Sequence, residues 1–582
     1  MGSQILIHQY FKHICIHFIY ILTKVNPMIK SSSMWLKLYQ KLTLYCLIAY
    51  KKITTWLDDD QHRRLCFYSC LGGFCLLALL LIWVGANKSL WGDEQFTIFT
   101  INSPWEHMWK ILREDFHPPG YYLLLRGFLA ITKPLLGIWN QTMLAKFFSY
   151  SANLILAGVG GYYLYRRKHP VSSVIFTLII LTGPLLLPYG FEIRMYSWSM
   201  LAVTLTYLAS LECLEKPTLK NFALLLASTL LAVYTQYYAA ISVIIIWGLL
   251  GWHFYRQHNF DALKTQFITG LLVILGFGPW LPSFWEQLNS LDRHPLGTFT
   301  FPLTLNNSWH LISAPFTPIG AAPSISTKQF DFNPFSFIFV LAAIAAYYYL
   351  APKQKSYRYT FAFLAYGLTV LVGIGLYFFN IPIFPRYLFP LCGCLAFATS
   401  MLFAQSKEFS PHLLPGLAAV LITVVTICIV NIIRFIIVEY HYNQDTLAWL
   451  PVIEEIKEAT SETVVAYDYN TACLLEKVVF LPDTNNLDCK TFYDADFANY
   501  FYPAIKDKDN FYIVTFLGNC SREEKLFRDN GFDPKLIFRS YTLENNCDHH
   551  SNLCAIQMVT PQCIFHVKLD ASDSARINGM ML

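Results

Sequence analysis

The sequence predicts an α-helical membrane protein that crosses the bilayer many times and ends in a small α/β domain. Of its 582 residues, 55% are hydrophobic and 14% are charged, and the mean hydropathy is +0.39. That composition is too apolar for a protein whose whole surface meets water. Apolar segments near the length of about 20 residues that a spanning helix needs recur between residues 65 and 438. Beyond them the chain becomes polar.

Residues 1–64 form a basic N-terminal extension. The segments 5–22 and 35–57 are apolar, but His and Lys interrupt them. This pattern is typical of amphipathic helices that lie on the membrane surface. No small-residue cleavage site follows a short apolar core, so we do not expect a cleavable signal. We expect the extension to be cytoplasmic or interfacial.

The membrane domain, residues 65–438, is predicted to contain about eleven spanning helices. Their approximate bounds are 65–86, 141–165, 171–189, 196–213, 221–237, 238–254, 267–282, 335–351, 360–380, 386–404 and 412–438.

The segment from Pro119 to Lys133 determines the predicted orientation. It is apolar, but it has only about 15 residues, or roughly 22 Å of helix. If it lies at the interface instead of spanning, all the short Lys- and Arg-rich loops, such as 166–168, fall on one side. The positive-inside rule makes that side the cytoplasm. We therefore expect an inner (plasma) membrane protein with its N-terminus in the cytoplasm and its C-terminal part in the periplasm.

Residues 439–582 are predicted to form that outer-face α/β domain, because strand and helix patterns alternate there. The expected strands are 463–467, 477–481, 511–516 and 535–540, and the expected helix is 521–530, ended by Gly531. Six of the 15 cysteines lie in the last 110 residues. An even number of cysteines in a polar domain favours disulfides in an oxidising compartment, although the spacing does not select the pairs.

The first outer loop, residues 87–140, brings together the candidate catalytic residues Asp93, Glu94, Asp115 and His117. A carboxylate at the hydrocarbon boundary acts as a general base or as a ligand for a divalent cation such as Mg²⁺ or Mn²⁺. Asp93 is the candidate metal ligand. Two prolines after His117 fix an extended backbone that orients it and Asp115. The alternative for each acid is a solvated position in the loop.

The candidate substrate-binding residues are Arg194 with Tyr196, and Arg386 with Tyr387, at outer ends of predicted spans. A guanidinium group suits a phosphate because its planar N–H fork donates two hydrogen bonds. The alternative is that these residues are interfacial anchors. Tyr237, in an aromatic cluster on the same face, is a weaker candidate.

A phosphate-binding side next to an acidic side at the membrane matches transfer of a sugar from a polyprenyl-phosphate carrier. A carboxylate would deprotonate an acceptor hydroxyl, which attacks C1 of the sugar, while arginines stabilise the leaving phosphate. The expected partners are the lipid-linked sugar donor, an acceptor that is a glycan, a lipid or a protein, and membrane lipids. Nothing in the sequence indicates nucleic-acid binding.

Four motifs in order carry a resemblance to a known family. They are D-E at Asp93, D-F-H-P-P-G-Y-Y from Asp115, E-I-R-M-Y-S from Glu192 and R-Y-L-F-P from Arg386. The set resembles the bacterial membrane glycosyltransferases of the GT-C superfamily, namely the family 39 relatives of protein O-mannosyltransferases and of the lipid A aminoarabinose transferase. The resemblance covers roughly residues 65–405.

This resemblance implies a GT-C-type fold with short juxtamembrane helices in the first outer loop. It also implies Asp93 as base or metal ligand, and Arg194, Tyr196 and Arg386 at the carrier phosphate. Many relatives have T-H-Y where this chain has Thr235-Gln236-Tyr237. The glutamine removes a histidine from that position.

Two other classes of protein remain as alternatives. A transporter or flippase for a lipid-linked glycan would place ionisable residues at mid-membrane and broken helices in matching halves. A non-catalytic receptor would use residues 439–582 to bind a partner and the spans only as an anchor.

Overall fold

The computed structural model describes most of the membrane domain and part of the C-terminal region. The described residues are scattered positions between 40 and 56, then 59–86, 92–115, 117–132, 141–290, 357–378, 385–404, 417–437 except 419, 464–467, 488–491, 505, 510–515, 520–539 and 563–569. The chain divides into two compact units, Met1–Cys66 with Gln405–Ile422 and Phe67–Ala404 with Thr423–Leu582. The second unit holds the helical bundle and the C-terminal sheet.

Within the described residues, seven helices are long and apolar enough to cross a membrane, and each matches a predicted span. They are α3 (Asp60–Ala86), α7 (Gln141–Arg166), α10 (Tyr196–Glu215), α12 (Tyr237–Arg256), the stretch Phe260–Asn289, the stretch Arg386–Phe403 and the helix Val420–Ile437. The stretch Phe260–Asn289 joins α13 (Phe260–Phe277), η3 (Gly278–Trp280) and α14 (Leu281–Ser290), while η7 (Pro385–Leu391) leads into α18 (Cys392–Ala404).

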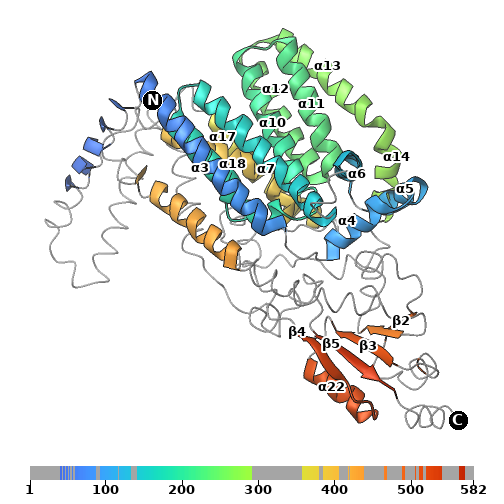
Figure 1. Cartoon of the computed structure of the whole chain (residues 1–582). Coiled ribbons are helices and arrows are strands. Elements are labelled where there is room, and N and C mark those ends of the chain that lie inside the picture. Colours follow the sequence, from blue (N-terminus) through green and yellow to red (C-terminus); the bar gives the residue numbers. More distant parts are fainter. Residues whose placement is uncertain are drawn as a thin grey trace, which may run out of the picture. The chain divides into compact units, whose positions relative to one another are not determined.

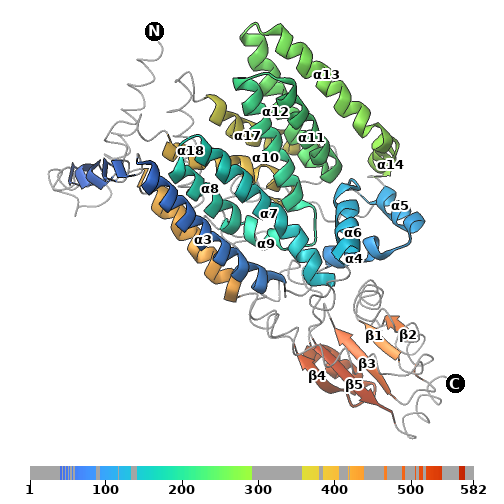
Figure 2. The same ribbon diagram turned by 45° about the horizontal axis from the view of Figure 1, so that its top comes forward.

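Two other predicted spans correspond to α11 (Leu219–Thr235) and to α17 (Tyr357–Tyr377), whose apolar segment is the shorter stretch Phe361–Leu376. The predicted span 335–351 lies outside the described residues. The total of about eleven spans therefore stays a prediction. α10 packs against α7, α11, α12 and α18 and forms the centre of the bundle (Figures 1 and 2).

The predicted span 171–189 is broken into α8 (Pro170–Thr182) and α9 (Leu186–Gly190). A broken helix inside a bundle exposes backbone carbonyls that need new hydrogen-bond donors. Asn431 Nδ2 donates to the carbonyls of Thr182 and Gly183 at 2.8 and 2.9 Å, and Asn153 Nδ2 donates to the Leu186 carbonyl at 3.0 Å. These side chains stabilise the break, after which residues 191–195 lead into α10.

In the described part of the predicted first outer loop, the chain forms three short helices, as the resemblance implied. They are α4 (Gly92–Asn102), α5 (Trp105–Glu114) and α6 (Gly120–Thr132), which lie near one another and near α14 (Figures 1 and 2). With 13 residues, α6 is too short to cross about 30 Å of hydrocarbon. Its length agrees with the predicted interfacial helix at 119–133.

The C-terminal part contains a mixed five-stranded sheet in the order β2-β1-β3-β5-β4. The strands are β1 (Val464–Tyr467), β2 (Asp488–Thr491), β3 (Asn510–Thr515), β4 (Lys535–Arg539) and β5 (Cys563–Lys568), and the helix is α22 (Cys520–Asp529). β1 pairs in parallel with β2 and β3, whereas β5 runs antiparallel between β3 and β4.

This sheet confirms three of the predicted strands, the predicted helix and the α/β class. Gly531 ends the helix with a φ of 83°, which glycine adopts without steric cost. β2 and β5 are strands that the sequence patterns did not predict. The predicted strand 477–481 lies outside the described residues.

One disulfide joins Cys520 at the start of α22 to Cys563 in β5, 43 residues later. Closing a loop of this length restricts the unfolded chain, and removing the bond is expected to cost about 2–4 kcal/mol. The paired change Cys520→Ser/Cys563→Ser should therefore speed tryptic cleavage within residues 464–569 of the intact protein. Cys75→Ser, at an exposed free thiol of α3, is the control. Equal cleavage rates in both variants would contradict a stabilising disulfide.

Candidate active site

Arg194 is the centre of a polar cluster at the outer-loop end of the bundle. Only 4% of its surface is exposed. Its Nη1 lies 3.2 Å from Thr97 Oγ1 and 3.4 Å from both the Asp93 carbonyl oxygen and the Tyr122 hydroxyl. Its Nη2 lies 3.4 Å from His117 Nε2. Arg194 therefore connects α4, the turn that follows α5, and α6.

The buried guanidinium of Arg194 carries a stabilised positive charge. Burial by itself lowers the pKa of Arg194, but the facing groups of Tyr122, Asp93 and Asp115 raise it well above its usual value. Its Nε has no hydrogen-bond partner among the residues that the structure describes. A buried charge with a donor to spare is suited to an anionic ligand.

Asp115, His117 and Tyr122 form a hydrogen-bonded network beside Arg194. Asp115 Oδ2 lies 3.1 Å from His117 Nδ1 and accepts from the Tyr122 hydroxyl at 3.0 Å. Because Nδ1 faces a carboxylate and Nε2 faces a guanidinium, the tautomer with its proton on Nδ1 satisfies both contacts. Burial and the Asp115 carboxylate raise the pKa of Tyr122 well above its usual value, so the phenol stays protonated. The network holds Arg194 in one position.

Asp93 lies between the two arginines that the sequence singled out. Its Oδ2 is 3.6 Å from Arg386 Nη1, and its main-chain carbonyl accepts from Arg194. The side chains of Asp93 and Arg386 are 36% and 27% exposed, so both remain accessible from outside the bundle. The structure thus brings together residues almost 300 positions apart in the chain, as the sequence predicted for one outer face.

The tyrosines next to the arginines extend this cluster. Tyr387 stacks on Tyr238 with ring centroids 5.1 Å apart, and Tyr196 meets Tyr189 edge-on at 5.5 Å. Tyr196 is buried. Aromatic contacts of this kind fix the backbone from which Arg194 and Arg386 project.

Glu94 is placed differently from its neighbour Asp93. It is fully buried, and its Oε1 accepts from Lys146 Nζ and from the Ile193 main-chain N–H, both at 2.8 Å. Lys146 on α7 is a site residue that the sequence prediction did not include. Its signal was present, since a lone lysine inside a predicted span requires a partner. Glu94 anchors the segment that carries Arg194, and its carboxylate does not line the open part of the cluster.

Tyr237 belongs to a second set of contacts between α5, η3 and α14. Its hydroxyl hydrogen-bonds Gln287 and accepts from Trp280 Nε1 at 3.0 Å. Gln287 in turn donates to the Leu112 carbonyl at 2.8 Å. The Tyr237 hydroxyl is thus engaged by η3 and α14 and hydrogen-bonds neither Arg194 nor Arg386.

Gln236 is buried between α11 and α12 with 3% of its surface exposed. Neither atom of its side-chain amide has a hydrogen-bond partner among the described residues. A buried amide without a partner is costly, so such groups usually meet water or ligand.

No cluster of three or more His, Cys, Asp or Glu with metal-binding geometry occurs in the described part of the chain. Asp115 is engaged by His117 and Tyr122, and Glu94 by Lys146. Asp93, next to a guanidinium, is therefore not accompanied by further protein ligands there.

Comparisons with known proteins give little beyond this geometry. No protein-family model matches the sequence, and no curated protein matches it. Among solved structures, the chain is similar to ArnT from Cupriavidus metallidurans in a crystal structure with bound undecaprenyl phosphate. The TM-score is 0.49 and the sequence identity 11%, over 86% of this chain and 98% of that one. At this level the likeness defines neither the family nor the activity of this chain.

Proposed function

We propose that the protein is a membrane glycosyltransferase that moves a sugar from a polyprenyl-phosphate carrier to an acceptor hydroxyl at the outer face. The observation that supports this most is the position of Asp93 between Arg194 and Arg386 at the edge of an apolar bundle. A base and a phosphate-binding pair in one place, next to lipid, are what this transfer needs.

The two arginines form the phosphate side of the proposed site. Arg194 is buried and fixed by four contacts, so it needs no reorganisation when a charge arrives. Arg386 is more exposed, and its Nη1 lies 3.6 Å from the Asp93 carboxylate, with the Tyr387 ring 5.9 Å from its guanidinium carbon. Two guanidinium groups can hold a lipid phosphate and stabilise it further as it leaves.

Asp93 is the proposed general base. It accepts the proton of the acceptor hydroxyl while that oxygen forms a bond to C1 of the sugar. The bond between C1 and the phosphate oxygen breaks, and its electron pair leaves with the lipid phosphate, where the arginines stabilise the charge. Asp115, His117 and Tyr122 position Arg194, because both His117 ring nitrogens are already engaged.

A divalent cation at Asp93, expected from the sequence as one alternative, has no built ligand set in the described residues. Arg386 next to Asp93 also opposes a second cation there. The proposed orientation puts the Cys520–Cys563 bond in the periplasm, where disulfides persist.

The phosphate side is tested with undecaprenyl phosphate alone, bound to the purified protein in lipid nanodiscs. Arg386→Gln and Arg194→Lys should each raise the Kd roughly 10- to 100-fold, as expected for losing a charge-assisted hydrogen bond of about 1.5–3 kcal/mol. Arg256→Gln, at an exposed arginine on α12, is the matched control and should bind like the wild type. Unchanged affinity in both site variants would exclude the proposed donor.

A further inference from the structure

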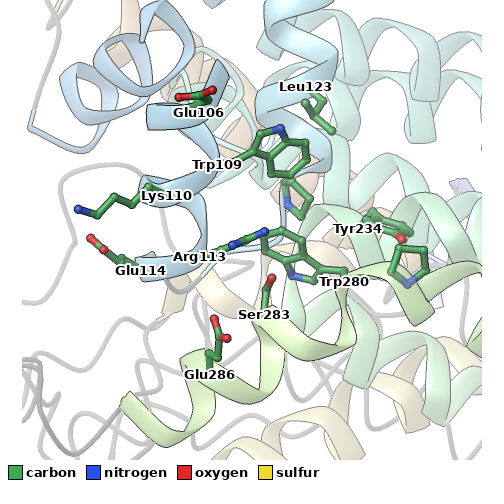
Figure 3. Close-up of a pocket in the computed structure, with 12 residues that line it drawn as sticks. Glu106, Trp109, Lys110, Arg113, Glu114, Leu123, Tyr234, Trp280, Ser283 and Glu286 are labelled. Atoms are coloured by element: carbon green, nitrogen blue, oxygen red, sulfur yellow. The ribbon is translucent and has the colours of Figure 1, made fainter. Parts of the chain in front are cut away.

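A pocket lies beside the Arg194 cluster and shares none of its residues. It has a volume of about 870 Å³ and lies between α5, α6, the end of α11, η3 and α14 (Figure 3). Its lining includes none of Asp93, Arg194 or Arg386. A pocket of this size accommodates a ligand of one or two rings.

Aromatic side chains form the apolar wall of this pocket. The indoles of Trp109 on α5 and Trp280 on η3 face each other, with ring centroids 6.2 Å apart and planes at 42° (Figure 3). The chain of hydrogen bonds from Trp280 through Tyr237 and Gln287 to the Leu112 carbonyl fixes this wall. Tyr234 adds a third aromatic ring to the lining. The wall is therefore pre-formed.

Charged side chains of both signs surround the aromatic wall. Glu106 and Glu114 come from α5 and Glu286 from α14, and all three are exposed. Arg113 extends toward Trp280, and Ser283 and Glu286 project from α14 below them in the view (Figure 3). The carboxylates accept hydrogen bonds, while Arg113 and Lys110 donate them.

We propose that this pocket binds the saccharide portion of the acceptor. A sugar ring has C–H faces that pack on an indole and hydroxyl edges that both donate and accept hydrogen bonds, which the mixed lining can satisfy. A lipid tail would leave five charged side chains to be desolvated, which is costly. A phosphate would meet three carboxylates against two cations. A polyhydroxylated ligand fits both the aromatic wall and the charged side chains that surround it.

The pocket adjoins the proposed reaction site, so this inference rests on the proposed function. Glu114 precedes Asp115 in the chain, and Pro119, also in the lining, follows His117 by two residues. The Tyr237 hydroxyl accepts a hydrogen bond from Trp280, one of the lining residues. The saccharide pocket therefore borders the turn that carries Asp115 and His117, which position Arg194.

The test is saturation-transfer NMR on the full-length protein in nanodiscs, with the methyl glycosides of glucose, mannose, galactose and N-acetylglucosamine as probes. We expect at least one glycoside to show transfer that falls at least fivefold in Trp109→Ala and about threefold in Glu286→Gln. Trp285→Ala is the matched control, because Trp285 lies next to Glu286 on α14 but is exposed and outside the lining. Its transfer should equal that of the wild type.

The outcomes separate the two proposals. Asp93→Asn should keep the saccharide signal, because Asp93 is not in the pocket. If undecaprenyl phosphate binds independently of Arg386 while the glycoside signal still depends on Trp109, the proposed donor is wrong and the saccharide pocket stands. No signal from any glycoside, or an equal signal in Trp109→Ala and Glu286→Gln and in the wild type, would overturn the pocket assignment. Glu286→Gln changes an exposed side chain, so it keeps the test valid if Trp109→Ala fails to fold.

Discussion

Replacing Asp93 by asparagine should lower the turnover of sugar transfer by about 10²–10⁴-fold, the usual contribution of a general base. The asparagine keeps the shape of the side chain but cannot take a proton. The main-chain carbonyl of residue 93 still accepts from Arg194, so the cluster should stay intact. The measurement is single-turnover transfer from a radiolabelled undecaprenyl-phosphate sugar by protein in nanodiscs.

The same variant should bind undecaprenyl phosphate at least as tightly as the wild type. Removing the carboxylate 3.6 Å from Arg386 leaves the guanidinium more available to the phosphate. A fall in turnover with unchanged or tighter donor binding is the signature of a group needed only in the transition state. Asp261→Asn, at an exposed acid on α13, is the control. Full activity of Asp93→Asn would contradict the role of Asp93 as general base.

The sequence predicted that the residues of this site converge. Their convergence depends on the membrane topology, which the sequence patterns indicate. Assigning 119–133 to the interface put Asp93, Arg194 and Arg386 on one face, and the structure brings these three together. Composition and charge patterns carry that kind of information, since they determine on which side of the membrane a residue lies.

The roles of neighbouring acids could not be predicted in the same way. Asp93 and Glu94 are adjacent, yet one is partly exposed and the other fully buried, because successive side chains on a helix point in directions about 100° apart. Which of them faces the core depends on where Lys146 of α7 lies, and that is a tertiary contact. Tyr237 was predicted to bind substrate, but tertiary contacts decide its position too. Its partners Trp280 and Gln287 lie some 40–50 residues further along the chain.

The pairing of the cysteines is another feature that the sequence could not predict. Six late cysteines indicated disulfides but not their partners, and the Cys520–Cys563 bond depends on α22 packing on β5. β5 is an inner strand with the sequence C-I-F-H-V-K, which the sequence patterns did not assign as a strand. Pairing is decided by the packing of the sheet, which spacing alone does not contain.

The Glu94–Lys146 pair leads to the largest stability effect that we expect. Both side chains are 0% exposed, so removing one charge leaves the other buried without its counter-ion. Breaking a buried pair in this way costs about 3–5 kcal/mol. Lys146→Met should therefore lower the free energy of unfolding by about that amount, measured by thermal or denaturant unfolding in nanodiscs. Because Glu94 also accepts from the Ile193 N–H, beside Arg194, undecaprenyl phosphate binding should weaken as well.

Removing both charges should recover much of this loss, because no uncompensated buried charge remains. The double variant Lys146→Met/Glu94→Gln keeps an acceptor for the Ile193 N–H and should be clearly more stable than Lys146→Met alone. The matched control is Arg167→Gln, which breaks ion pairs of similar length with Glu212 and Glu215 at a site where all three side chains are partly exposed. That change should lower the free energy of unfolding by less than about 1 kcal/mol. If Lys146→Met were as mild as Arg167→Gln, the buried pair would not be what holds the segment before Arg194 in place.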